Sequence, residues 1–230
     1  DDGRAASEFA SAGVTAKARL GKTVVKHGTL LPKTPVLVNN DARLLPQTFD
    51  GTQLTSTDIA GLTFTAGHLD RFKQRDSSNT MGLYLDGYSG DKSGDFSFAG
   101  ADYTLTEQLR LSYFHGQLEY FYRQDYAGLV HDLPLAGGVL TTDLRYFKSK
   151  SMGAAYGGPI DNDMFSGQVS YAHSGHTFGA GYQVLDGEAG LPYISGATVY
   201  SFSNVGIGKF IEEEEKTWMA SYAYNFAAAG

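Results

Sequence analysis

The sequence predicts an all-β protein, specifically a transmembrane antiparallel β-barrel. Three observations predict this fold: apolar and polar residues alternate, several predicted strands have ten or more residues, and tight turns alternate with long polar loops. Successive side chains of a strand point to opposite faces, so a period of two indicates strands with one apolar face. Short turns at one end and long loops at the other are typical of outer-membrane barrels.

The first predicted strand lies within residues 14–23 and has two different faces. One face is apolar from Val14 to Leu20, and the other carries two cations, Lys17 and Arg19. If the apolar face of such a strand meets lipid, the cations face the interior of the barrel.

The same alternation recurs along the chain and predicts about nine or ten strands. Strands of globular sheets usually have about five or six residues, whereas a membrane-spanning strand needs about 9–11. Arg110 and Arg145 fall on polar faces, and in residues 96–105 the phase slips at Ala99–Gly100, as a β-bulge would cause. The apolar faces of the clearest later strands are Leu62, Phe64 and Ala66; Leu109, Leu111 and Tyr113; Leu140, Leu144 and Tyr146; Phe165, Val169 and Tyr171; and Trp218, Ala220, Tyr222, Tyr224 and Phe226.

A soluble β-sandwich or a lipocalin-like barrel is the alternative fold, and two features argue against it. Aromatic residues cluster at Tyr120–Tyr122 and Tyr222–Phe226, as in the interfacial girdles of membrane barrels. The faces opposite the apolar ones are polar along their whole length, where a sandwich core would be apolar. Solubility without detergent would favour the soluble alternative.

Composition excludes several function classes. The chain has 230 residues and no cysteine, which excludes disulfides, a thiol nucleophile and a cysteine-ligated metal. Its net charge of −7 argues against nucleic-acid binding, and no apolar window of about 18 residues predicts a membrane helix. The sequence contains neither a G-x-S-x-G nor an H-E-x-x-H motif, so we expect no enzyme, no metal and no cofactor. A barrel enzyme is kept as an alternative from another class.

Several stretches together resemble the OprD family of outer-membrane porins. They are "HGTLLPKTPVLVNNDARLLPQTFDGTQLTS", "RDSSN", "YAGLVHDLPLAGGVLTTDLRYF", "HTFGAGYQVLDGEAGLPY" and "EEKTWMASYAYNFAA". The resemblance implies a monomeric barrel of about 18 strands, of which this chain is an internal portion, in the outer membrane of a Gram-negative bacterium. The implied partners are outer-membrane lipid, lipopolysaccharide and small carboxylate solutes that diffuse passively. Cyclic or aromatic carboxylates are slightly favoured, with basic amino acids or peptides as the alternative.

The resemblance also implies where the channel narrows. It predicts inward-folded loops near residues 30–53 and 186–204 within one barrel domain. Arg43 of the first loop would either meet solute or pin the loop to a wall carboxylate. The second loop would supply Asp186, Tyr193, Ser201 and Ser203 as acceptors and hydroxyls, each of which is otherwise a solvated loop residue. Lys17, Arg19, Arg110 and Arg145 would be the remainder of a basic ladder. The run Glu212–Glu215 is a solvated acidic segment or a contact to divalent cations of the lipopolysaccharide leaflet.

Overall fold

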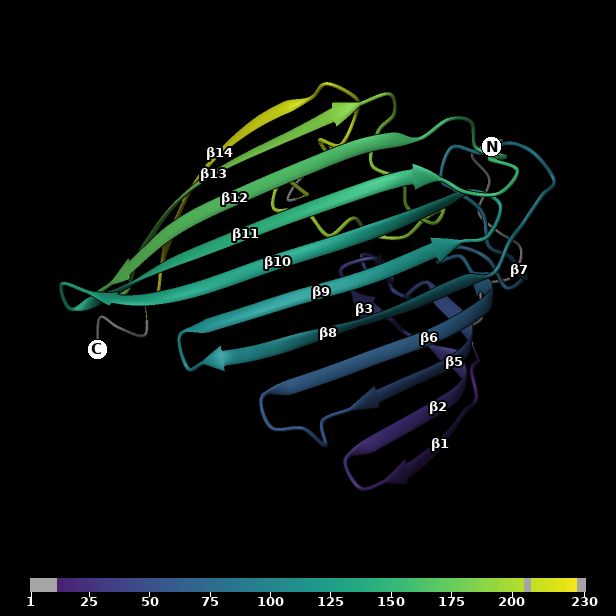
Figure 1. Ribbon diagram of the computed structural model, residues 1–230, viewed down its shortest axis with the longest axis horizontal. Coiled ribbons are helices and arrows are strands. Elements are labelled where there is room, and N and C mark those ends of the chain that lie inside the picture. The colour runs from purple at the N-terminus through teal and green to yellow at the C-terminus, as the bar shows by residue number, and fades with distance from the viewer. Residues whose placement is uncertain (1–11, 205–207, 227–230) are drawn as a thin grey trace.

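The sheet is a single antiparallel meander. The structure is a computed structural model, and it describes residues 12–204 and 208–226. Twelve strands form the main sheet, in which neighbours along the path β1-β2-β5-β6-β8-β9-β10-β11-β12-β13-β14 pair and β7 pairs with β6 (Figure 1). The main-sheet strands are β1 (Thr15–Leu20), β2 (Thr23–Leu30), β5 (Thr48–Ser56), β6 (Leu62–Lys73), β7 (Thr80–Gly82), β8 (Phe96–Thr106), β9 (Leu109–Leu118), β10 (Tyr122–Leu135), β11 (Gly138–Ser151), β12 (Asp161–His173), β13 (His176–Gly187) and β14 (Lys216–Tyr224).

The fold class predicted from the alternation is confirmed, but the predicted number of strands was too low. Two further short strands, β3 (Lys33–Thr34) and β4 (Leu37–Val38), pair with each other outside the main sheet. In β2 the two-residue period is blurred by the consecutive Val24 and Val25, so the sequence marks this strand less clearly than the later ones. In the described ranges, no helix is long and apolar enough to cross a membrane.

The two ends of the sheet differ as predicted. Figure 1 shows the tight hairpins β8–β9, β10–β11 and β12–β13 at one end of the strands, on the left of the view. The longer connections lie at the opposite end, and the one between β6 and β8 contains β7. His173 and His176 pair across the β12–β13 turn, where Ser174 and Gly175 have positive φ, so both histidines flank a tight turn.

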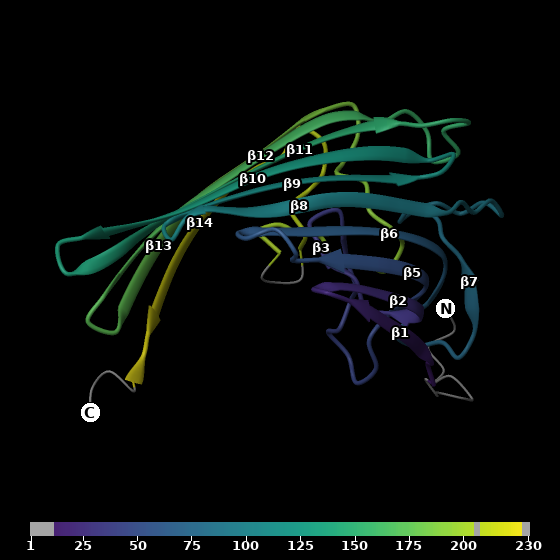
Figure 2. The same ribbon diagram turned by 60° about the horizontal axis from the view of Figure 1, so that its bottom comes forward.

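One face of the sheet is apolar and exposed over its middle. Phe64, Leu111 and Trp218 are 39%, 37% and 79% exposed, so they do not meet in a common dry core. Figure 2 shows that the sheet curves around the segment containing β3, which therefore lies on the opposite, concave side. The alternation thus places large apolar side chains on the convex face, where a barrel meets lipid.

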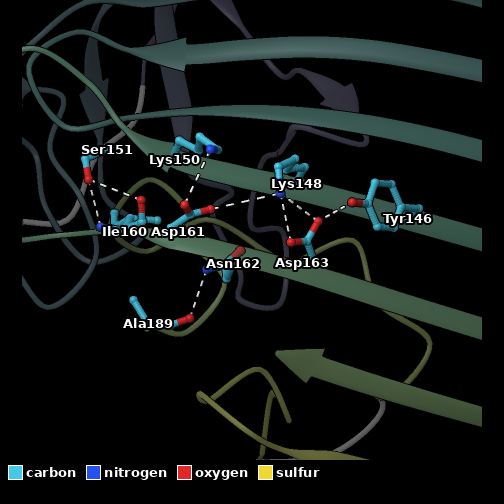
Figure 3. A network of polar contacts seen from close by, with 9 residues as sticks. All are labelled: Tyr146, Lys148, Lys150, Ser151, Ile160, Asp161, Asn162, Asp163 and Ala189. Carbon is cyan, nitrogen blue, oxygen red and sulfur yellow. Dashed lines mark hydrogen bonds and ion pairs between the residues drawn. The ribbon is translucent and has the colours of Figure 1, made fainter. Parts of the chain in front are cut away.

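A charged border follows the apolar band on the convex face, near the ends of the strands that carry the long loops. Lys148 of β11 contacts Asp163 of β12 at 2.8 Å and lies 4.0 Å from Asp161, and Lys150 contacts Asp161 at 3.4 Å. Tyr146 donates a hydrogen bond to Asp163 from the apolar side (Figure 3). The neighbouring Asn162 points the other way and donates to the carbonyl oxygens of Ala189 and Gly190 at 2.9 and 2.8 Å.

The concave face is not polar along its whole length, which corrects the prediction. Near the long loops it carries an apolar layer that packs against inward-folded segments. Its wall residues include Phe96, Phe114, Phe147, Met164 and Leu185, each no more than 2% exposed. Leu191, Ile194 and Val199 of the segment before β14 belong to the same buried cluster. The interior is therefore dry near the loops and polar farther along the strands.

This layer explains two wrong predictions. The phase does not slip at Ala99–Gly100, because Phe96 and Phe98 point inward in register with Gly100. The irregularities lie instead at Asp50–Gly51 and Thr104–Thr106.

The predicted girdle at Tyr120–Tyr122 is also wrong. Phe121 and Tyr122 are fully buried in the inner layer, and Tyr120 sits in the β9–β10 turn with φ of 67°. The second cluster does lie on the surface, since Tyr222 and Phe226 are 58% and 81% exposed.

Candidate functional site

Two long connections fold over the concave face and form the candidate site. The first covers residues 31–47, between β2 and β5. Because β5 already begins at Thr48, this segment ends six residues before the predicted bound at residue 53. The second runs from residue 188, after β13, to residue 215, before β14, and is longer than the predicted 186–204. Pro32, Pro35 and Pro46 restrict the backbone of the first segment, which helps it hold its shape without ladder partners.

The two segments are bonded to each other. Val38 and Thr198 form an isolated β-bridge in which the Thr198 N–H donates to the Val38 carbonyl oxygen at 2.9 Å. The side-chain amide of Asn40 donates to the Gly196 carbonyl at 3.0 Å, and that of Gln47 donates to the Ser195 carbonyl at 2.8 Å. These bonds join parts of the chain about 150 residues apart and hold both segments in the interior.

A cavity of about 530 Å³ lies between the first segment and the wall. Its polar side includes Asp102 of β8 and Ser112 of β9, whose hydroxyl donates to the Asp102 carboxylate at 2.6 Å. The residues that line it are Leu31, Lys33, Thr34, Pro35, Val38, Gln53, Thr65, Asp102, Ser112, Phe114 and Tyr200. Both infolded segments therefore contribute to this space, because Tyr200 belongs to the second.

Lys17 and Arg19 lie on β1, on the same face as the inward residues of β2 and β5. The register places Lys17 directly opposite Lys26, which in turn pairs with Gln53 of the cavity wall. Lys26 was not predicted, because only strand register reveals that it stands beside Lys17. Three cations on two adjacent strands give this side of the interior a positive charge.

Arg110 also faces inward, from β9. Its guanidinium lies 3.8 Å from the Asp132 carboxylate, and its side chain is 57% exposed. Asp132 additionally accepts a hydrogen bond from Thr141 at 2.7 Å. Arg110 is therefore loosely paired, and most of its side chain is exposed.

Arg145 on β11 has a different environment. Its Nε and Nη2 donate to the two carboxylate oxygens of Asp143 at 3.2 and 2.9 Å, and its side chain is 13% exposed. The rings of Tyr200 and Phe202 lie 4.2 and 3.7 Å from the guanidinium carbon. The second infolded segment thus covers Arg145.

The hydroxyls of Ser201 and Ser203 are both occupied, that of Ser201 by the wall and that of Ser203 by Ser201. The Ser201 hydroxyl donates to the Gln183 side-chain oxygen at 2.5 Å and lies 2.8 Å from the Ser203 hydroxyl. Ser166 of β12 donates to the same Gln183 oxygen at 3.2 Å. Ser203 is 5% exposed, and through the Ser201 hydroxyl this pair holds the segment on β13.

Tyr193 belongs to a polar cluster at the end of the sheet that carries the long loops. Its hydroxyl donates to Asp86 and accepts from Lys209, while the Lys209 ammonium lies 3.8 Å from Asp86. Burial raises the pKa of Tyr193 above its ordinary value of 10.0, and the hydrogen bond to Asp86 raises it further. Asp86 and Lys209 were not predicted, and together with Tyr193 they line a second cavity of about 340 Å³.

Two predicted site residues lie apart from these groups. Arg43 is exposed in the first segment, and its contact with a solute stays a prediction. Asp186 is exposed on β13 opposite Asp163, on the convex face of the charged border. The structure therefore does not bring Asp186 together with Tyr193, Ser201 and Ser203. Within the described part of the chain, no group of three or more His, Asp or Glu side chains could hold a metal ion.

Comparison with known proteins agrees with this architecture. The model of the outer membrane porin, OprD family, matches residues 1–230. The chain is 32% identical to the porin-like protein GalP of Pseudomonas putida and 31% identical to porin D of Pseudomonas aeruginosa. Each comparison includes the whole chain but only 57% and 54% of the relative, so the chain spans about half the length of these relatives.

Solved structures of Pseudomonas aeruginosa proteins are also similar. OccK9 (OpdG) is 39% identical, with a TM-score of 0.95 over 100% of this chain and 59% of that one. The structure of OpdK with vanillate is 35% identical, with a TM-score of 0.91 over 100% of this chain and 61% of that one. The alternating strands, the infolded segments and the match along the whole chain lead to one assignment: this chain belongs to the OprD family of outer membrane porins.

Proposed function

We propose that the chain forms part of a substrate-selective outer-membrane channel for passive diffusion of small carboxylate-containing solutes. The observation that carries this proposal is the cavity of about 530 Å³ between the infolded segment and the wall. A channel needs a constriction that binds solute weakly enough to release it. The hydrogen bonds that join the two segments across the concave face support a constriction at this place.

The inward cations support a carboxylate as the solute. Lys17 and Lys26 lie side by side without a carboxylate between them in the register, and Arg110 is only loosely paired. Arginine and lysine bind carboxylates through charge-assisted hydrogen bonds. The related OpdK structure contains vanillate, which is an aromatic carboxylate, and this favours cyclic or aromatic solutes for the present chain.

A basic amino acid or peptide is the second candidate, and Asp102 favours it. This carboxylate lines the cavity beside Ser112 and would attract an ammonium or guanidinium group. A solute that carries both charges could contact Asp102 at one end and a lysine at the other. The two candidates therefore differ in whether Asp102 contributes to solute binding.

Single-channel recording of the full-length protein in planar bilayers tests the proposal. We expect discrete conductance steps, and we expect benzoate to reduce the chloride current more than the neutral benzyl alcohol does. A stronger effect of arginine than of benzoate, abolished by Asp102→Asn, would favour the second candidate. A current that responds to neither solute would contradict both.

A further inference from the structure

Arg145 is an inward-facing cation that does not line the cavity. Its guanidinium is bound in a bidentate manner to Asp143, two residues before it on the same strand, and little of the side chain is exposed. The adjacent carboxylate balances its charge. Arg145 is therefore poorly placed to meet a solute, although its residue type and parity suggest a pore cation.

The guanidinium instead contacts the second infolded segment through two aromatic rings. Tyr200 and Phe202 both pack on it, and a guanidinium is planar and weakly hydrated, which suits contact with ring faces. Between these rings, the Ser201 hydroxyl donates to Gln183, and the Ser203 hydroxyl after them contacts that of Ser201. Four consecutive residues are thus fixed on the wall, with the rings on Arg145 and the hydroxyls toward β13.

Tyr200 belongs both to the four residues fixed on the wall and to the lining of the cavity in which the proposed solute binds. Besides contacting Arg145, it lines the cavity of about 530 Å³. Its ring also meets the buried ring of Tyr126 edge to face, with 5.7 Å between centroids. The position of the Tyr200 ring, and hence the width of the cavity, depends on what holds this segment to the wall.

We infer that Arg145 is a positioning residue that sets the width and solute preference of the channel by holding Tyr200 and Phe202 against β11. The inference rests on the proposed function. In this role, Arg145 acts by packing against the two rings. A cation of the basic ladder would instead act by attracting the solute with its charge. The two roles predict opposite outcomes for a lysine at this position, since lysine keeps the charge but loses the planar two-point contact.

The test compares Arg145→Lys and Phe202→Leu with the unmodified full-length protein in planar bilayers. Phe202→Leu leaves the Arg145–Asp143 pair intact and removes one of the two rings. Arg123→Lys on β10 is the matched control. Arg123 is exposed and stands between Tyr122 and Gln124, which are buried and face inward, so the Arg123 side chain points away from the interior. The shift of folded barrels on gels without heating shows whether each variant has folded.

We expect both test variants to raise single-channel conductance by about twofold and to increase current noise, because flow follows pore width. We also expect them to lose preference for benzoate over larger carboxylates, while Arg123→Lys changes neither property. Unchanged conductance and preference in Arg145→Lys and Phe202→Leu would overturn the inference. So would a loss of carboxylate preference without wider flow in Arg145→Gln, since that result would indicate a charge contact with solute.

A cross-link provides a measurement that does not depend on Arg145→Lys folding. The sequence contains no cysteine, so Ser201→Cys and Gln183→Cys can be joined by a short bifunctional thiol reagent. In the Phe202→Leu background, the cross-link should restore the original conductance and noise, and a failure to restore them would contradict positioning. If the unmodified channel shows no carboxylate preference, the proposed function fails, but conductance and noise still test the role of Arg145.

Discussion

The backbone N–H of Thr198 donates a hydrogen bond to the carbonyl oxygen of Val38, across 160 residues of sequence. This bond joins the two infolded segments directly, away from the wall that holds each of them. The position of each segment over the concave face therefore depends on a contact between the two segments as well as on the wall.

Thr198→Pro removes this donor, because proline has no backbone N–H. We expect a loss of about 0.5–1.5 kcal/mol in the free energy of unfolding and more frequent current fluctuations in bilayers. Thr198→Val keeps the N–H and a similar volume, so it is the control. Equal current noise in the two variants would show that the bridge does not steady the constriction.

Asp58 lies at the end of the sheet that carries the tight turns, and its hydrogen bonds predict how the stability of the fold depends on pH. Its carboxylate accepts hydrogen bonds from the Thr23 hydroxyl at 2.5 Å, the Lys22 N–H at 2.8 Å and the Ser56 hydroxyl at 3.1 Å. The bond from Thr23 contributes most to lowering the pKa of Asp58 below its ordinary value of 3.8, and the Lys22 N–H is second.

Because the folded pKa is lower than the unfolded one, the stabilisation is complete above the unfolded value and is lost as the pH falls through the folded value. When the pH is lowered below 3.8, we expect the unfolding temperature of the unmodified protein to decrease. The decrease should be smaller in Asp58→Asn. Heating at a series of pH values, followed by the gel shift of folded barrels, measures this difference. Identical acid profiles for the two proteins would contradict the role of Asp58.

Alternation predicts which residues share a face, but not what covers that face. It correctly separated Phe165 and Val169, which are exposed on the convex face, from Ser166 and Gln168, which point to the concave side. It misjudged Phe96 and Phe98, since the infolded segments make part of the interior dry and apolar residues then point inward too. Period alone cannot distinguish an apolar residue facing lipid from one facing a buried loop.

The candidate site was predictable only where the chain's local pattern determines it. Lys17 and Arg19 follow from strand parity. Arg145 was assigned to the interior by the same parity, but its covering by Tyr200 is a contact between residues 55 positions apart that no local pattern encodes. Strand register is equally non-local, which is why Lys26 was missed.

The lipid-facing assignment predicts different effects for two adjacent substitutions on β12. Val169 is 44% exposed on the convex face, between the charged border and the β12–β13 turn, whereas Gln168 points inward. An arginine at the middle of the lipid face should cost about 2–4 kcal/mol, so Val169→Arg should fold poorly in lipid vesicles. Gln168→Arg should fold nearly as well as the unmodified protein. Equal folding yields for the two variants would contradict the assignment of faces.

Arg110 provides the most direct test of carboxylate binding by an inward cation. Its side chain is mostly exposed, and its distance of 3.8 Å from Asp132 leaves the guanidinium available to a passing anion. The loss of a solvent-exposed charge contact lowers the binding free energy by about 0.2–1 kcal/mol. Arg110→Gln should therefore weaken benzoate binding by up to about fivefold. The measured quantity is the benzoate concentration that halves the chloride current through single channels. Arg110→Lys keeps the charge and should retain most of the affinity. If the glutamine variant binds benzoate as tightly as the lysine variant does, the charge of Arg110 does not act on the solute, and Lys17 and Lys26 become the cations to test.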